Sequence, residues 1–286
     1  MFAKAGLFCV ASIAVFSMEC ASAAEDTPEA VLAKVESLAG QGKALTAVSL
    51  AYDYFIENGF ADRAERLRPK LEDVQKKFAE GVGGEFTLYR VKKDETLGLI
   101  ADRFKVTANF LMKVNGITDA KSLVPDTDIK VAEGPFSAKV YLNERRVVIC
   151  LGDARIKDFP VAIGGPTPDR ATPIGTFSVT EKTEKPRYDH GKEHYPGGDP
   201  RNPTGARWLR LKDTNVPESK SAKSFRFGLH GTNEPEKIGL AVSEGCIRFK
   251  NEDVVQVYDF LVKGSLVIVT QAMPVKETVS AEKGVQ

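Results

Sequence analysis

One polar, glycine-rich stretch, HGTNEPEKIGLAVSEGCIRF at positions 230–249, contains both a histidine and a cysteine. A cysteine attacks substrates as its thiolate, and because its ordinary pKa is about 8.5, a base or a positive neighbour has to assist at neutral pH. His230 is flanked by glycines at the end of a predicted strand, so its ring can project toward Cys246 as that base. The pair predicts acyl transfer through a thioester on the cysteine.

The residues around the cysteine fit the same chemistry. Gly245 lets the backbone approach a substrate closely, so the neighbouring amides can form an oxyanion hole. Arg248 places a positive charge near the thiol and can bind a carboxylate. Ser243 and Thr232 carry short hydroxyl groups that could orient the histidine or its loop. An inward-facing Glu244 would raise the pKa of the thiol slightly, and we expect this carboxylate to face solvent.

Other reactive residues are better explained by packing or by loop structure. Cys150 lies in the β-branched run RRVVICLG and is expected to lie in the core. His190 and His194 have the spacing of two zinc ligands, but the glycines and prolines among them disfavour a helix, and we expect no metal and no other cofactor. Their segment, 186–200, is instead predicted to be a mobile loop that could cover the site.

The segment that carries the cysteine and the histidine, 136–271, is predicted to consist mainly of short strands. Turns containing Gly, Pro and Asp separate the strand-like runs, which lie at 139–142, 147–151, 159–163, 176–180, 206–211, 225–229 and 265–270. This pattern favours a mainly-β sandwich or barrel-like domain. A single helix is expected after Cys246, with Asn251 as its N-cap. Its predicted buried stripe comprises Val254, Val257, Tyr258 and Leu261.

Upstream, residues 87–132 show the order strand, helix, helix, strand, with Thr96 as a suitable cap for the first helix. The segment resembles the lysin motif (LysM) through Y-x-V, E-T-L, I-A, N-G and the closing P-D-T-D-I-K-V. The resemblance implies binding to the N-acetylglucosamine-containing glycan of peptidoglycan; a module retained only for packing is the alternative. Asp94 and Asp126 stand where the family usually has glycine, and the turns should still form because Asp tolerates turn geometry.

Residues 28–80 are predicted to be helical, because their apolar residues recur at helical spacing. Gly59 ends one helix, and Pro69 predicts a kink or a restart in the next. The pattern is loosely that of one helix-turn-helix repeat unit. A spacer or packing module is favoured over a partner-binding repeat, and residues 81–85 form a flexible joint.

The first residues have the features of a secretory signal peptide, namely Lys4, a short apolar run at 5–18 and an A-S-A cleavage site at 21–23. The apolar run is too short to span a bilayer. Cleavage would leave Cys150 and Cys246, and their different contexts argue against a disulfide between them. A thiol that stays accessible in an oxidising compartment indicates reactivity. We therefore expect an exported protein of the periplasm or cell wall, without a stable membrane anchor.

Charge is nearly balanced, with 40 Lys and Arg against 39 Asp and Glu and a net charge of +1. This balance disfavours a nucleic-acid binder and a polybasic membrane surface. The length of 286 residues predicts two or three domains. Neither charge nor length fixes an oligomeric state.

Residues 136–270 resemble the catalytic domain of the L,D-transpeptidases, which cross-link bacterial peptidoglycan. The matching stretches are H-G-T, the I-G of the following loop, S-x-G-C-I-R, YPGGDPRNPTGARWLRL and ATPIGTFSV. In this family a cysteine attacks the carbonyl of the third stem-peptide residue, commonly meso-diaminopimelate, and expels the terminal D-alanine. An amine, often from another stem, then resolves the thioester.

The resemblance implies a role for each matching residue. Cys246 would be the nucleophile, His230 the general base and Arg248 a substrate-binding or loop-ordering group, while Gly231 and Gly245 match the glycines of the motif. Glu244 departs from the family, in which many members have a second histidine at this position.

Two classes of function remain open. The first is an L,D-transpeptidase that is acylated by a stem tetrapeptide; water instead of an amine as acceptor would make it an L,D-carboxypeptidase. The second is a non-catalytic scaffold that binds peptidoglycan, with Cys246 as a buried structural thiol. The predicted division of the chain is a signal peptide at 1–23, a helical segment and linker at 24–85, a LysM-like domain at 86–133, a catalytic domain at 134–271 and a polar tail at 272–286.

Overall fold

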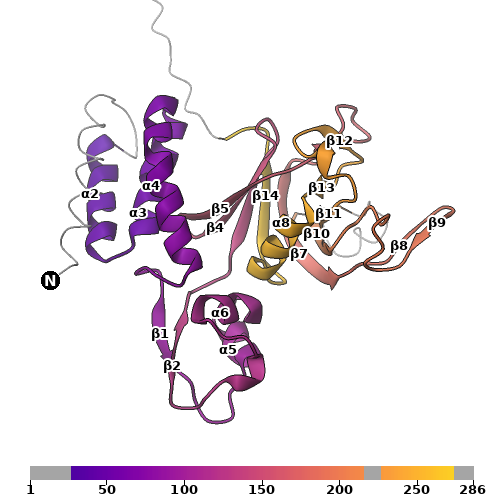
Figure 1. The fold of residues 1–286 in the computed structure, drawn as a ribbon. Coiled ribbons are helices and arrows are strands. Elements are labelled where there is room, and N and C mark those ends of the chain that lie inside the picture. Colours follow the sequence, from indigo (N-terminus) through magenta and orange to yellow (C-terminus); the bar gives the residue numbers. More distant parts are fainter. Residues whose placement is uncertain (1–26, 216–226, 274–286) are drawn as a thin grey trace, which may run out of the picture. The chain divides into compact units, whose positions relative to one another are not determined.

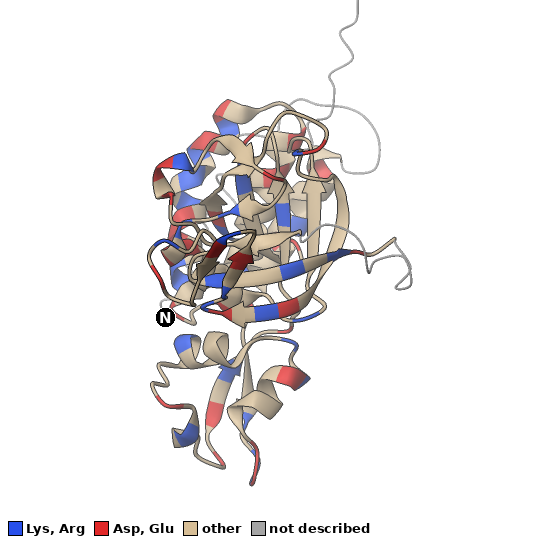
Figure 2. Ribbon diagram, turned by 90° about the vertical axis from the view of Figure 1, so that its right-hand side faces the viewer, with Lys and Arg blue, Asp and Glu red and all other residues tan. Residues whose placement is uncertain are grey.

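The computed structural model describes residues 27–215 and 227–273, and the predicted signal peptide and nearly all of the polar tail lie outside these residues. Two compact units form the described chain: one holds the residues up to Glu85 together with Met273, and the other runs from Phe86 to Ala272. Basic and acidic residues are interspersed along the ribbon (Figure 2), in keeping with the net charge of +1.

The first unit contains three helices, α2 (Pro28–Gly40), α3 (Ala44–Glu57) and α4 (Ala61–Ala79) (Figure 1). The Thr27 side chain caps α2 by accepting a hydrogen bond from the amide of Ala30. Helix α3 packs against both of the others. The prediction of a helix restart at Pro69 is wrong, because α4 continues through it. Leu67 and Leu71, buried on either side of the proline, hold the same helix face in the core.

The second unit begins with the predicted strand-helix-helix-strand module, and the predicted order is confirmed. Its elements are β1 (Thr87–Arg90), α5 (Leu97–Arg103), α6 (Ala108–Asn115), the short 3₁₀ helix η1 (Ala120–Ser122) and β2 (Asp128–Val131). Strands β1 and β2 pair antiparallel. Thr96 caps α5 by accepting a hydrogen bond from the amide of Leu99, as predicted. The two turn residues Asp94 and Asp126 adopt positive φ angles of 65° and 61°, the conformation for which glycine is usual.

The rest of the second unit is mainly β, as predicted. Its strands are β3 (Ser137–Tyr141), β4 (Arg146–Leu151), β5 (Ala154–Pro160), β6 (Ile163–Gly164), β7 (Gly175–Glu184), β8 (Tyr188–His190), β9 (Glu193–Tyr195), β10 (Arg207–Asp213), β11 (Gly228–His230), β12 (Ala241–Ser243), β13 (Ile247–Arg248) and β14 (Leu266–Thr270). The 3₁₀ helix η2 (Pro235–Lys237) precedes β12, and the α-helix α8 (Asn251–Phe260) precedes β14.

Eight of these strands form one sheet in the order β13-β11-β10-β7-β14-β3-β4-β5. The last strand, β14, lies inside the sheet, antiparallel to β7 and parallel to β3. Strand β14 thus joins the early strands and the later strands of the domain into one hydrogen-bonded sheet. The β11–β13 pair is also parallel. It forms one edge of the sheet.

Helix α8 differs from the prediction at its start. Its N-cap position is Lys250, which makes no side-chain capping hydrogen bond, and Asn251 is the first residue of the helix. The carboxamide of Asn251 is used elsewhere, as described below. Val254 and Val257 are buried as expected. Tyr258 is only partly buried, and its ring lies under the ammonium group of Lys182, 4.1 Å from the ring centre.

Candidate active site

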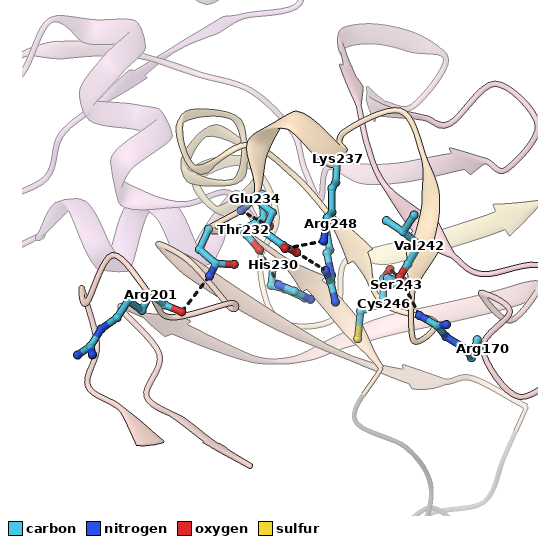
Figure 3. Close-up of polar contacts among 12 residues, drawn as sticks. Arg170, Arg201, His230, Thr232, Glu234, Lys237, Val242, Ser243, Cys246 and Arg248 are labelled. Atoms are coloured by element: carbon cyan, nitrogen blue, oxygen red, sulfur yellow. Dashed lines mark hydrogen bonds and ion pairs between the residues drawn. The ribbon is translucent and has the colours of Figure 1, made fainter. Parts of the chain in front are cut away.

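The parallel strands β11 and β13 bring His230 and Arg248 onto one face of the sheet. His230 and Arg248 are direct partners in the register of these strands. Partners on adjacent strands point their side chains to the same face, and so do residues two apart along a strand. Cys246 directly precedes β13, two residues before Arg248. Figure 3 shows the side chains of His230, Cys246 and Arg248 in one cluster.

His230 is held as a neutral base. Its ring Nδ1 lies 2.6 Å from the carbonyl oxygen of Gly231, and because a carbonyl can only accept, Nδ1 carries the proton and Nε2 keeps its lone pair. Burial, followed by the nearby charge of Arg248, lowers the pKa of His230 to about 4. The ring of Trp208, from the neighbouring strand β10, stacks on it with centroids 5.2 Å apart. The imidazole thus has a fixed plane and a fixed tautomer.

Cys246 rests as a protonated thiol. Burial raises the pKa of Cys246 to about 11, while a backbone hydrogen bond with Gly228 and the charge of Arg248 lower it. The side chain is half-buried. A thiol with such a pKa needs a base during attack, and the neutral histidine in the same cluster is suited to that task.

Arg248 acts electrostatically on both partners, since its charge lowers the pKa of His230 and that of Cys246. Its Nη1 lies 3.7 Å from a carboxylate oxygen of Glu234. Glu234 also pairs with Lys237, one turn later in the chain. This ion-pair chain fixes the guanidinium group above the sheet edge (Figure 3).

The loop before the cysteine is held by hydroxyl groups. The Ser243 hydroxyl, fully buried, donates to the Cys246 carbonyl oxygen (2.6 Å) and accepts from the Gly245 amide (3.1 Å). The Thr172 hydroxyl donates to the Gly245 carbonyl oxygen at 2.9 Å. Gly245 has a φ of 105°, a conformation that other residues rarely adopt. Gly245 therefore shapes the loop. Its own N–H donates to Ser243 and is not free to donate to a substrate oxygen.

The H-G-T turn is organised by buried polar contacts. Thr232 is 2% exposed, and its hydroxyl accepts from the amide of Glu234 at 3.0 Å. The amide of Gly231 donates to the carbonyl of Arg207 at 3.2 Å. Thr232 therefore orders the loop of the histidine, one of the two roles that the sequence suggested for it.

Comparisons with known proteins agree with this geometry. The family model of the L,D-transpeptidase catalytic domain (YkuD) matches residues 135–269, and that of the LysM domain matches residues 89–132. "Putative L,D-transpeptidase YqjB" of Bacillus subtilis (strain 168) is 36% identical over 146 residues, which cover 49% of this chain and 76% of that protein. The chain belongs to the L,D-transpeptidase family.

A second relative supports the same assignment. "Putative L,D-transpeptidase YkuD" of Bacillus licheniformis is 31% identical over 64% of this chain and 98% of its own length. Among solved structures, an L,D-transpeptidase from Mycobacterium tuberculosis H37Rv has 16% sequence identity and a TM-score of 0.37, and covers 51% of this chain and 63% of its own. An L,D-transpeptidase from Mycobacterium smegmatis has 18% sequence identity and a TM-score of 0.37, and the match covers 52% of this chain and 64% of that chain. This chain thus spans less than two thirds of each of these solved chains.

Glu244, where many L,D-transpeptidases have a histidine, is exposed, as the sequence predicted. Its charge nevertheless raises the pKa of the neighbouring Cys246 thiol, an effect expected only for an inward-facing carboxylate, although burial is the larger cause. The position thus opposes thiolate formation slightly. The charge of Arg248 and the backbone hydrogen bond with Gly228 lower the pKa of the thiol.

The segment at 186–200 contains a β-hairpin, β8–β9, where the sequence predicted a mobile loop. Tyr188 in the hairpin has a raised pKa, caused by burial and then by the charges of Glu193 and Glu244, with Arg248 acting in the opposite direction. The charges of Glu244 and Arg248, which flank the cysteine, thus act on Tyr188 in the hairpin. His194 is paired with Asp189 at 2.8 Å across the hairpin.

Sequence reasoning missed three residues that contribute to the candidate site, namely Thr172, Trp208 and Asn251. Thr172 and Trp208 lie inside the matched motifs ATPIGTFSV and YPGGDPRNPTGARWLRL. The motifs were therefore the available signal, but they gave no role for either side chain. Cys150 is buried in β4, as expected for a core residue. Within the residues described, no helix is long and apolar enough to cross a membrane.

Proposed function

We propose that this protein is an exported peptidoglycan L,D-transpeptidase in which Cys246 is the nucleophile and His230 the general base. The observation that supports the proposal is a neutral, tautomer-fixed imidazole, paired with Arg248 in the register of β11 and β13, in one cluster with the thiol of Cys246 (Figure 3). Family membership supplies the reaction class. A stem tetrapeptide is the proposed acyl donor.

In the acylation step, Nε2 of His230 takes the thiol proton as the sulfur of Cys246 attacks the carbonyl carbon of the third stem residue. The amide bond to the terminal D-alanine then breaks, and the histidine returns the proton to the leaving amine. The products are a thioester and free D-alanine. Arg248 favours the developing thiolate, because it is the charged neighbour that lowers the pKa of the thiol.

In the second step, an amine of another stem attacks the thioester carbonyl. His230 accepts a proton from that amine, the carbon–sulfur bond breaks, and the thiolate is reprotonated by the imidazolium. One amide bond has been exchanged for another, so the reaction needs no oxidant, metal or nucleotide. Water in place of the amine would give the L,D-carboxypeptidase product.

The LysM domain is proposed to hold the protein on glycan strands. Its strand-helix-helix-strand order and its family model support this role. A chain lacking residues 86–133 should sediment less with purified sacculi than the intact chain, with circular dichroism confirming that the remaining chain is folded. Equal sedimentation of the two folded chains would count against glycan binding.

The decisive experiment is incubation with disaccharide-tetrapeptides followed by mass spectrometry. A cross-linked dimer together with released D-alanine is expected for the wild type and should be absent for Cys246→Ala. Tripeptide alone would indicate a carboxypeptidase. No product and no adduct on Cys246 would leave the non-catalytic scaffold as the function.

A further inference from the structure

We propose that Asn251 is a positioning residue for the general base His230. The role of His230 as general base rests on the proposed function, whereas the claim that Asn251 orients its ring does not. Asn251 is the first residue of α8. Asparagine at this place in a sequence predicts a helix cap. Its carboxamide instead connects two distant loops, one of which contains the histidine.

Both ends of the carboxamide are engaged. Oδ1 accepts a hydrogen bond from the amide of Ala206, and Nδ2 donates to the carbonyl oxygen of Thr232, each at 2.9 Å. Beside this clamp, the amide of Gly231 donates to the carbonyl of Arg207. The H-G-T turn is thus bound to the segment that leads into β10 through one side chain and one backbone bond.

The clamp is linked to the histidine by consecutive carbonyl groups. Nδ1 of His230 donates to the carbonyl of Gly231, and Asn251 donates to the carbonyl of the next residue, Thr232. The orientation of these two peptide groups is coupled, because they share one short turn. Release of the Thr232 carbonyl would therefore loosen the hydrogen bond that fixes the tautomer of the imidazole.

Two glycines make room for the clamp. A Cβ atom added to Gly205 or to Gly231 would overlap Oδ1 of Asn251, well inside van der Waals contact. Gly205 also has a φ of 64°, which favours glycine. The N-P-T-G and H-G-T motifs therefore place their glycines where this carboxamide must lie. Helix α8, anchored in the core by Val254 and Val257, provides a fixed base for it.

The test uses the full chain and compares Asn251→Ala and Asn251→Asp with Glu252→Gln. Glu252 is the exposed neighbour in the same helical turn and serves as the matched control. The aspartate keeps the acceptor for Ala206, loses the donor to Thr232 and adds a negative charge that repels the Thr232 carbonyl oxygen. The readouts are the nitrogen signals of His230 in ¹⁵N-histidine-labelled protein and the rate at which iodoacetamide alkylates Cys246, followed by peptide mass spectrometry.

Both Asn251 variants should lose the single Nδ1–H tautomer and raise the pKa of His230 from about 4 toward its ordinary value, as the ring gains freedom and water. Alkylation at pH 7 and acylation by tetrapeptide should fall about 10- to 100-fold, the scale expected for a displaced catalytic group. Glu252→Gln should match the wild type. If Asn251→Ala fails to fold, the isosteric Asn251→Asp variant alone tests whether Asn251 positions His230.

Unchanged histidine signals and alkylation rates in a folded Asn251 variant would overturn the inference. A lowered melting temperature with wild-type histidine signals would also overturn it, since that result indicates a purely structural side chain. Failure of the proposed function would give a different experimental result. The wild type would then give no cross-linked product, whereas the histidine signals would still report whether Asn251 positions the ring.

Discussion

Arg248 lies directly opposite His230 across the parallel strands β11 and β13. A permanent positive charge beside the imidazole opposes its protonation, and the same charge favours ionisation of the Cys246 thiol. Burial acts on both groups more strongly than this charge does. The resting pair is consequently a neutral imidazole and a neutral thiol, and the proton should move only when a substrate carbonyl is attacked.

Activity should persist at acidic pH. His230 is a base only when unprotonated, and because its pKa is lowered to about 4, the acid limb of kcat/KM should fall near pH 4 instead of near pH 6.5. The measurement is kcat/KM for tetrapeptide acylation over pH 3.5–8, with single-turnover mass spectrometry as a control for product release. An acid limb near pH 6.5 would show a solvated imidazole.

Removal of the charge at position 248 should slow thiol chemistry. Arg248→Gln should raise the pKa of both Cys246 and His230, and alkylation of the thiol by iodoacetamide at pH 8 should fall about tenfold, which corresponds to one pKa unit. Arg248→Lys keeps the charge and is the matched control. Equal rates in the glutamine variant and the wild type would mean that the charge does not reach the sulfur.

The buried histidine should make stability depend on pH. The folded pKa of about 4 lies below the unfolded value of 6.5, so the unfolded state binds more protons between these values and stability falls as pH falls through that window. From pH 7 to pH 4 the free energy of unfolding should drop by about 3 kcal/mol on account of this group. His230→Gln should lack this part of the slope in urea unfolding. Parallel slopes for the two proteins would refute the assignment.

The hydroxyl of Ser243 should be needed for both stability and reactivity. Ser243→Ala leaves the buried Gly245 amide and Cys246 carbonyl without this partner, and each unsatisfied group costs about 1–3 kcal/mol. The melting temperature and the alkylation rate of the cysteine should both fall. Ser178→Ala, a change at a partly buried serine in strand β7 of the eight-stranded sheet, is the control. A wild-type alkylation rate in the Ser243 variant would restrict this side chain to a packing role.

Local features of the sequence predicted local structure well. Thr96 caps α5 because its partner, the amide of Leu99, is three residues away. Asp94 and Asp126 form the expected turns because aspartate tolerates the positive φ angles that these turns need. His230 and Cys246, which belong to one sequence motif, lie in one cluster (Figure 3).

Contacts between distant parts of the chain and very short strands explain where the structure differs from the sequence-based predictions. Asn251 does not cap its helix because Ala206 and Thr232, from other parts of the chain, take both ends of its carboxamide. Strand β13 has two residues, too few to give a periodic pattern. Both strands of the β8–β9 hairpin are short and rich in polar residues, and they lack the alternation of apolar and polar residues by which a strand is predicted.

The position of β14 has a consequence for how this domain matures. Residues Leu266–Thr270 supply the ladder that links β7 to β3, so a growing polypeptide that ends before them holds two separate half-sheets. The eight-stranded sheet can therefore form only once residues 266–270 are present, whereas β11 and β13, which carry His230 and Arg248, pair with each other at the far edge without touching β14.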